Sequence, residues 1–170
     1  VAGSMINLYE DISQTAEEVN IVYDKTTLTN QNVTATLNSN KNITITNNNG
    51  KNTYTFEQNG KFTFEYTDQT GEKKSITATV NWIDKVAPVG TISYSTKDVT
   101  RENVIATLIT NEEVTVTNNN GSKKYTFTES GKFTFEFVDK AGNKGTSTAE
   151  VTWINKNAPT ATVTYSTTKP

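Results

Sequence analysis

The sequence predicts an all-β chain made of two tandem β-sandwich domains, each with about six to seven strands. Three observations carry this prediction. About a third of the 170 residues are Thr or Asn, which favour strands and turns respectively. Apolar and polar residues alternate in short runs, and no window shows the 3.6-residue period of a helix. A long internal repeat indicates that one unit occurs twice.

The internal repeat gives the expected domain boundaries. Ile21 matches Ile92 and then Val163, an offset of 71 residues (92 − 21, and again 163 − 92). The alignment of the two copies needs no gap, and roughly half of the aligned positions are identical. The expected divisions are a cloning scar and linker over 1–16, a first domain over 17–87, a second over 88–158, and the first strand of a truncated third repeat over 159–170.

Six stretches of each unit alternate apolar and polar residues, so we expect strands with one face in the core. In the first unit the inward positions are Val19, Ile21 and Tyr23; Val33, Ala35 and Leu37; Ile43 and Ile45; Tyr54 and Phe56; Phe62, Phe64 and Tyr66; Ile76, Ala78, Val80 and Trp82. The second unit repeats this pattern, except that Ser147 replaces Ile76 and breaks the inward stripe. Trp82 and Trp153 remain in phase with their strands, so we expect both to be substantially buried.

The Asn-rich segment 47–50 has two interpretations. Asn49-Gly50 is typical of a type I′ hairpin, which would set Ile45 opposite Tyr54. Alternatively, the segment crosses from one sheet to the other, and the following strand turns at Gly60 into the next one. We favour the crossover.

The composition excludes several kinds of chemistry. The chain has no cysteine and no histidine, which removes disulfides, Ser-His-Asp and Cys-His catalysis and the usual zinc sites. A net charge of −2 gives no reason to expect nucleic-acid binding, and no apolar run is long enough for a membrane helix. We expect a monomer with no enzymatic activity, no cofactor and no membrane insertion.

Several motifs resemble the bacterial immunoglobulin-like repeats of Gram-positive surface and secreted proteins. They are GKFTF at 60–64, DQTG at 68–71 and WIDKVAP at 82–88, with DKAGN at 139–143 and WINKNAP at 153–159 in the second copy. The resemblance covers about 17–158 and implies two tandem immunoglobulin-like sandwiches at an extracellular or cell-surface location. Phe62 and Phe133 stand where eukaryotic immunoglobulin domains have a tyrosine, so no phenolic hydroxyl is expected to tie that corner.

Three aspartates are candidate calcium ligands. Asp68 and Asp139 begin Asp-x-x-Gly turns, in which the carboxylate more commonly caps backbone amides while the glycine takes a positive φ. Calcium needs several oxygen ligands, and this motif offers few. Asp84 lies near the end of the first unit, but the matching position is Asn155, which weakens an inter-domain calcium site.

Two other chemistries receive little support from the sequence. Glu65 and Glu136 alternate with inward aromatic residues, so we expect them on a solvated face rather than in a glycosidase pair. A Lys–Asn or Lys–Asp cross-link, known in some surface immunoglobulin-like domains, needs an apolar core and a carboxylate. The lysines mostly fall in turns and at outward positions.

The resemblance leaves three functions open. The first is a non-catalytic stalk or spacer whose partners are neighbouring repeats of the same chain. The second is an adhesin-type module that binds host matrix protein or glycan. The third is an accessory region of a secreted carbohydrate-active enzyme or peptidase. Near-identical loops in the two copies favour the stalk. Pro88 and the absence of a Gly/Ser linker predict a stiff junction and an end-to-end length of about 60–80 Å.

Overall fold

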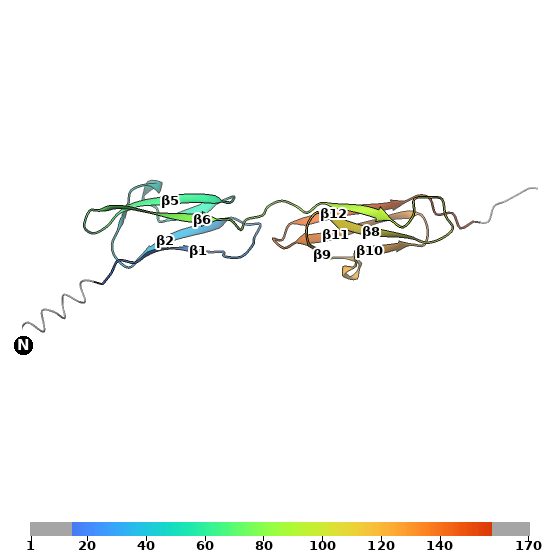
Figure 1. Ribbon diagram of the computed structural model, residues 1–170, viewed down its shortest axis with the longest axis horizontal. Coiled ribbons are helices and arrows are strands. Elements are labelled where there is room, and N and C mark those ends of the chain that lie inside the picture. Colours follow the sequence, from blue (N-terminus) through green and yellow to red (C-terminus); the bar gives the residue numbers. More distant parts are fainter. Residues whose placement is uncertain (1–14, 158–170) are drawn as a thin grey trace, which may run out of the picture. The chain divides into compact units, whose positions relative to one another are not determined.

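A computed structural model describes residues 15–157 of the chain. These residues form two compact units, with the division between Val86 and Ala87 (Figure 1). The expected cloning scar at the N-terminus and the expected third-repeat strand over 159–170 lie outside the described residues.

The first unit contains six strands in two antiparallel three-stranded sheets. The strands are β1 (Val19–Tyr23), β2 (Val33–Ser39), β3 (Thr44–Ile45), β4 (Thr53–Phe56), β5 (Gly60–Thr67) and β6 (Lys73–Val80). One sheet has the order β1-β2-β4 and the other the order β3-β5-β6. A parallel bridge between Thr29 and Ile83 joins the loop after β1 to the segment after β6.

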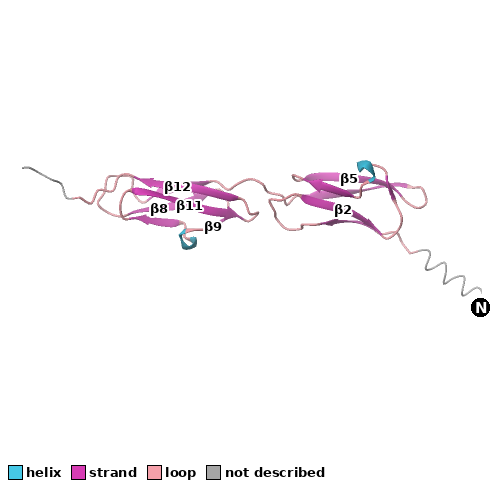
Figure 2. Cartoon of the chain, turned by 180° about the vertical axis from the view of Figure 1, so that it is seen from behind, coloured by secondary structure: helices cyan, strands magenta, loops and turns pink. Residues whose placement is uncertain are grey.

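The second unit repeats this arrangement, and Figure 2 draws the strands of both units in magenta. Its strands are β7 (Gly90–Tyr94), β8 (Val104–Thr110), β9 (Val114–Val116), β10 (Lys124–Phe127), β11 (Gly131–Asp139) and β12 (Lys144–Val151). The sheets have the orders β7-β8-β10 and β9-β11-β12, and a parallel bridge joins Thr100 to Ile154.

The strand order identifies both units as immunoglobulin-like sandwiches. An immunoglobulin constant-type domain has strands A, B, E and D in one sheet and C, F and G in the other. Here the sheets correspond to A-B-E and C-F-G, and within residues 15–157 neither unit has a strand D. A three-residue 3₁₀ turn, η1 (Asn48–Gly50) or η2 (Asn119–Gly121), lies between C and E instead. The chain is therefore all-β, with two tandem immunoglobulin-like domains.

The crossover prediction for 47–50 is confirmed, and the hairpin alternative is wrong. Ile45 pairs with Tyr66 of β5, whereas Tyr54 pairs with Ala35 of β2, so β3 and β4 belong to different sheets. Asn48, Asn49 and Gly50 have φ values of 55°, 53° and 76°. Asn and Gly tolerate this left-handed region better than other residues, so they suit the turn that carries the chain between sheets.

The predicted inward residues form one core in each unit. Val33, Ala35, Phe64, Ala78 and Val80 are almost fully buried in the first core. The second core repeats this with Val104, Ala106, Phe135, Ala149 and Val151. The half-buried Phe62 stacks on Tyr54 with ring centroids 4.0 Å apart, and Phe133 stacks on Tyr125 in the same way.

The tryptophans differ from expectation in depth and position. β6 ends at Val80 and β12 at Val151, so Trp82 and Trp153 lie just beyond the strands and are half-buried. Each indole packs edge-on against a tyrosine ring. The ring centroids are 5.0 Å apart for Trp82 and Tyr23, and 5.2 Å apart for Trp153 and Tyr94. The apolar alternation predicts the inward direction, but it does not indicate where the strand pairing stops.

Candidate functional site

Asp68 caps the turn between β5 and β6, as its Asp-x-x-Gly motif predicts. Its Oδ1 accepts hydrogen bonds from the Thr70 amide (2.8 Å), the Thr70 hydroxyl (2.6 Å) and the Glu72 amide (2.9 Å). Gly71 has a φ of 85°, in the left-handed region that glycine adopts without strain. One carboxylate oxygen is therefore committed to the turn.

The other oxygen of Asp68 faces an ammonium group. Lys74 Nζ lies 3.0 Å from Asp68 Oδ2 and 3.2 Å from Glu17 Oε1. The hydrogen bond from the Thr70 hydroxyl, together with Lys74, holds the pKa of Asp68 well below its usual range. In turn, the carboxylates of Asp68 and Glu17 raise the pKa of Lys74. A metal ion at Asp68 would have to displace this lysine.

Asp139 caps the equivalent turn of the second unit with different partners. Its Oδ1 accepts bonds from the Ala141 amide (2.9 Å) and the Asn143 amide (2.8 Å), and its Oδ2 accepts one from Asn143 Nδ2 (3.0 Å). Asp139 is 5% exposed, and Gly145 occupies the position that matches Lys74. Burial by itself would raise the pKa of Asp139, but the bonds from Asn143 and Ala141 outweigh it and lower the pKa.

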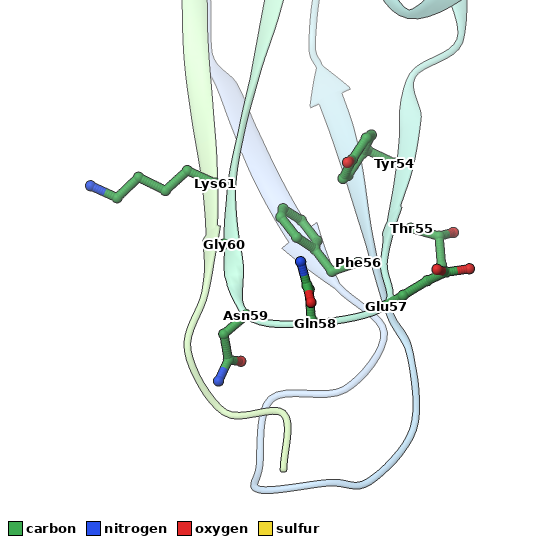
Figure 3. A pocket seen from close by; sticks show the side chains of 8 residues that line it. All are labelled: Tyr54, Thr55, Phe56, Glu57, Gln58, Asn59, Gly60 and Lys61. Carbon is green, nitrogen blue, oxygen red and sulfur yellow. The ribbon is translucent and has the colours of Figure 1, made fainter. Parts of the chain in front are cut away.

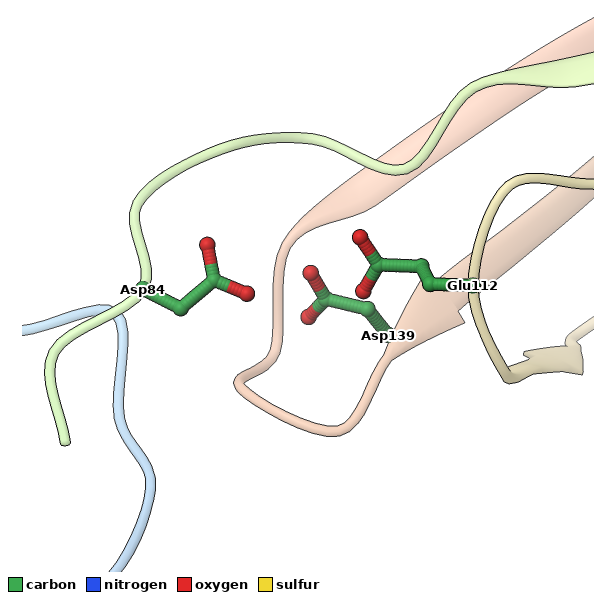
Figure 4. A group of neighbouring side chains, drawn as sticks. All are labelled: Asp84, Glu112 and Asp139. Carbon is green, nitrogen blue, oxygen red and sulfur yellow. The ribbon is translucent and has the colours of Figure 1, made fainter.

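A second carboxylate lies close to Asp139 in the same unit. Carboxylate oxygens of Glu112 and Asp139 are within 4.8 Å of each other (Figure 4). The sequence interpretation missed Glu112 because the matching residue of the first unit is Lys41. Figure 4 also draws Asp84, which belongs to the first unit, where its Oδ1 accepts a bond from the Val86 amide (2.9 Å). Calcium binding at Asp68, Asp84 and Asp139 stays a prediction.

A hollow of about 510 Å³ opens at the corner between β4 and β5 of the first unit (Figure 3). Its lining runs from Tyr54 to Lys61 and is mostly exposed and polar. Glu57, Gln58 and Asn59 are replaced by Thr128, Glu129 and Ser130 in the second unit. Asn59 is already engaged, because its Nδ2 donates to the Ile83 carbonyl (2.9 Å) and its Oδ1 accepts from the Ile83 amide (2.8 Å).

Three hydrogen bonds, which we call the terminal clamp, fasten the segment after the last strand of each unit. In the first unit the Thr29 amide donates to the Trp82 carbonyl (3.0 Å), and the Asp84 amide donates to the Thr29 carbonyl (2.8 Å). Trp82 Nε1 donates to the Lys25 carbonyl (2.9 Å). The second unit has the same bonds, between Thr100 and Trp153 (3.0 Å), Asn155 and Thr100 (2.8 Å), and Trp153 and Thr96 (2.9 Å).

A tyrosine hydroxyl ties the first strand of each unit to the last one. The Thr79 amide donates to the Tyr23 hydroxyl at 3.0 Å, and the Glu150 amide donates to the Tyr94 hydroxyl at 2.9 Å. As expected, neither Phe62 nor Phe133 offers a phenol. These tyrosine bonds were not predicted, because their partners are 56 residues apart in sequence.

Two Lys–Asn pairs recur, but in settings that do not suit a cross-link. Lys85 Nζ donates to Asn32 Oδ1 at 2.6 Å, and Lys156 Nζ donates to Asn103 Oδ1 at 2.7 Å. All four residues are exposed, whereas the cross-linking chemistry needs an apolar core. Glu65 and Glu136 are also exposed, as the alternation predicts.

Neither a protein-family model nor a curated protein matches the sequence. Among solved structures, the chain is similar to the crystal structure of murine CEACAM1b, with a TM-score of 0.36 and 12% identity. That match covers 79% of this chain and 99% of the other. The immunoglobulin-like assignment rests on the strand order given above. Over residues 15–157, no helix has the length and apolar character required to cross a lipid bilayer.

Proposed function

We propose that the chain is a non-catalytic spacer of the immunoglobulin-like type found in Gram-positive surface and secreted proteins, and that it transmits tension outside the cell. The observation that carries the proposal is the path of the chain through each unit. Glu17, just before β1, pairs with Lys74 at the start of β6. Tyr23, at the end of β1, bonds to Thr79 near the end of β6. The chain therefore enters at one end of the sandwich and leaves at the other.

This path decides how the unit responds to a pulling force. Tension between the two ends would slide β1 and the segment after β6 past each other along their length. The terminal clamp joins the loop after β1 to the segment after β6, and the tyrosine bond joins β1 to β6, so both would be loaded together. A single hydrogen bond contributes only about 1 kcal/mol to stability, but bonds loaded in parallel must break at nearly the same moment.

The repetition of these contacts supports the same proposal. The terminal clamp, the tyrosine bond and the Lys–Asn pair recur in both units with nearly the same distances. In contrast, the lining of the corner hollow changes from Glu57, Gln58 and Asn59 to Thr128, Glu129 and Ser130. The contacts at the end where the chain leaves each unit are therefore kept in both copies, whereas the residues of the corner hollow are not.

Single-molecule pulling in two directions tests the proposal. The chain has no cysteine, so introduced pairs provide unique handles. Glu17→Cys with Val86→Cys loads the first unit along its ends. Gln58→Cys with Asn81→Cys peels β5 from β6, because Gly60 pairs with Val80 at that edge. We expect a clearly higher unfolding force for the first pair. Equal forces, or a lower force along the ends, would contradict a tension-bearing role.

A further inference from the structure

We infer that Asn49 and Asn120 are sites of spontaneous covalent modification, at which the side-chain amide is lost and aspartate or isoaspartate is formed. The chain contains three Asn-Gly sequences, at Asn49, Asn59 and Asn120. A glycine after asparagine leaves the following backbone amide unhindered, so all three share the same local chemistry. The structure places them in two different settings, and this difference predicts which of them react.

The reaction needs no enzyme. The backbone nitrogen of the glycine attacks Cγ of the asparagine, an N–Cγ bond forms, the Cγ–Nδ2 bond breaks, and ammonia leaves with the amide proton. The resulting five-membered succinimide then adds water at one of its two carbonyl groups. Opening on one side gives aspartate, and opening on the other gives isoaspartate, in which the main chain runs through the side-chain carbon.

Asn49 and Asn120 are positioned to react. Both are exposed, and neither side chain makes a hydrogen bond within the part of the chain that the structure describes. The neighbouring Asn48 is engaged, because its Nδ2 donates to the Lys51 and Thr53 carbonyls. Asn49 must rotate out of its left-handed conformation before the glycine nitrogen can reach Cγ. That rotation breaks two bonds of a surface turn, from the Gly50 amide to the Asn47 carbonyl (2.9 Å) and from the Lys51 amide to the Asn48 carbonyl (3.0 Å).

Asn59 has the same neighbour but is held in place. Its amide makes two hydrogen bonds to Ile83, and Gly60 is the first residue of β5, paired with Val80. Attack on Cγ would require both side-chain bonds to break and the end of the strand pair to open. Local opening costs little in surface turns and approaches the full unfolding free energy in core strands. Asn59 is therefore protected by the fold, whereas Asn49 and Asn120 are not.

The modification would change the charge of the surface without opening the core. Each event adds one negative charge to a chain whose net charge is −2. Neither turn contains a buried residue, so the sandwiches would stay folded. Because the two sites are equivalent in the repeat, each unit would carry one modified turn.

Peptide mapping by mass spectrometry tests the inference. The intact protein is aged at mildly alkaline pH, with and without denaturant, and aspartate and isoaspartate are quantified at the three sites. In the folded protein we expect Asn59 to react at least about tenfold more slowly than Asn49 and Asn120, which corresponds to about 1.4 kcal/mol of extra opening free energy. In denaturant the three rates should converge. Equal rates in the folded protein, absence of product at Asn49 and Asn120, or a difference that persists in denaturant would each overturn the inference.

Discussion

The two units close the same end of their sandwiches by different means. In the first unit Val19 of β1 and Ile76 of β6 are half-buried apolar residues that pack against the core. In the second unit the matching residues are Gly90 and Ser147, and the Ser147 hydroxyl donates to the Gly90 carbonyl at 2.8 Å. A Cβ atom at Gly90 would lie 2.6 Å from Ser147 Oγ and 2.9 Å from the ring of Phe137. The glycine lets the first strand approach the last one directly.

The turn beside this end differs in a matching way. The first unit places Lys74 between Asp68 and Glu17. The second unit has Gly145 there, and a Cβ atom on it would lie 2.6 Å from the ring of Phe137 and 2.7 Å from the Pro88 carbonyl. A charged network in one unit is thus replaced by close backbone packing in the other. The comparison shows that these positions change as a set even though the alignment of the units has no gap.

The largest expected effect comes from placing the first unit's valine in the second unit. Gly90→Val should destabilise the second unit by about 3 kcal/mol, because the new side chain would overlap Ser147, Leu108 and Phe137. Adding Ser147→Ile should recover part of this loss, since it restores the apolar pair of the first unit. Each unit has one tryptophan, so denaturant melts in a Trp82→Phe background report on the second unit alone. A loss below about 1 kcal/mol would mean that the close approach is not required.

The opposite end of the sandwich should respond equally in the two units. Trp82→Ala and Trp153→Ala each remove an edge-on tyrosine contact and an indole hydrogen bond. We expect a loss of about 2–3 kcal/mol in either unit. Circular dichroism is the suitable probe, since each variant removes one fluorophore. Losses that differ by more than about 1 kcal/mol would show that the terminal clamps are not equivalent.

A smaller and equally matched loss is expected from the tyrosine hydroxyls. Tyr23→Phe and Tyr94→Phe keep the ring against the tryptophan but leave the Thr79 or Glu150 amide without its acceptor. Each should cost about 1 kcal/mol in denaturant melts. The same variants should lower the unfolding force along the ends by more than they lower it in the peeling direction. No change in the force along the ends would place the tyrosine bond outside the load-bearing set.

The strands and cores could be predicted from the sequence because alternation is a local property. The alternation of polar residues with Phe62, Phe64 and Tyr66 predicts a strand and its inward face, and the prediction does not require knowing which strands pair with it. The terminal clamp could not be predicted, because it joins the Thr29 backbone to a segment more than fifty residues later. The role of Ser147 could be predicted only in part. The alternation shows that it breaks the stripe, but only the fold shows that Gly90, 57 residues earlier, accepts its hydrogen bond.

The same distinction applies to the candidate site. Asp68 and Asp139 were predicted as turn caps from four consecutive residues, and that local role is what the structure shows. The side chains that contact these carboxylates were not predicted. Lys74 and Asn143 serve the two turns from different positions, and Glu112 reaches Asp139 from a separate loop. Residue identities within a turn define its cap, whereas the side chains that approach the carboxylate from outside the turn depend on how the surrounding strands pack.

The smallest expected effect is a difference between the Asp68 turn and the Asp139 turn in how acid and salt change the stability of the unit that contains each. Both carboxyl groups have a lowered pKa in the folded state. Their stabilising contributions are therefore fully present above the unfolded value of about 3.9 and are lost as the pH falls below it towards the folded value. Acid should weaken both units, but salt should weaken the first more, because Lys74 is a charge partner of Asp68 whereas Asn143 is a neutral amide and the Lys140–Glu113 pair of the second unit is highly exposed. Thermal melts at low and high salt, compared with Lys74→Met, measure this difference. The variant should reduce the salt sensitivity of the first unit, and an unchanged sensitivity would assign it to other charges such as the Asp24–Lys25 pair.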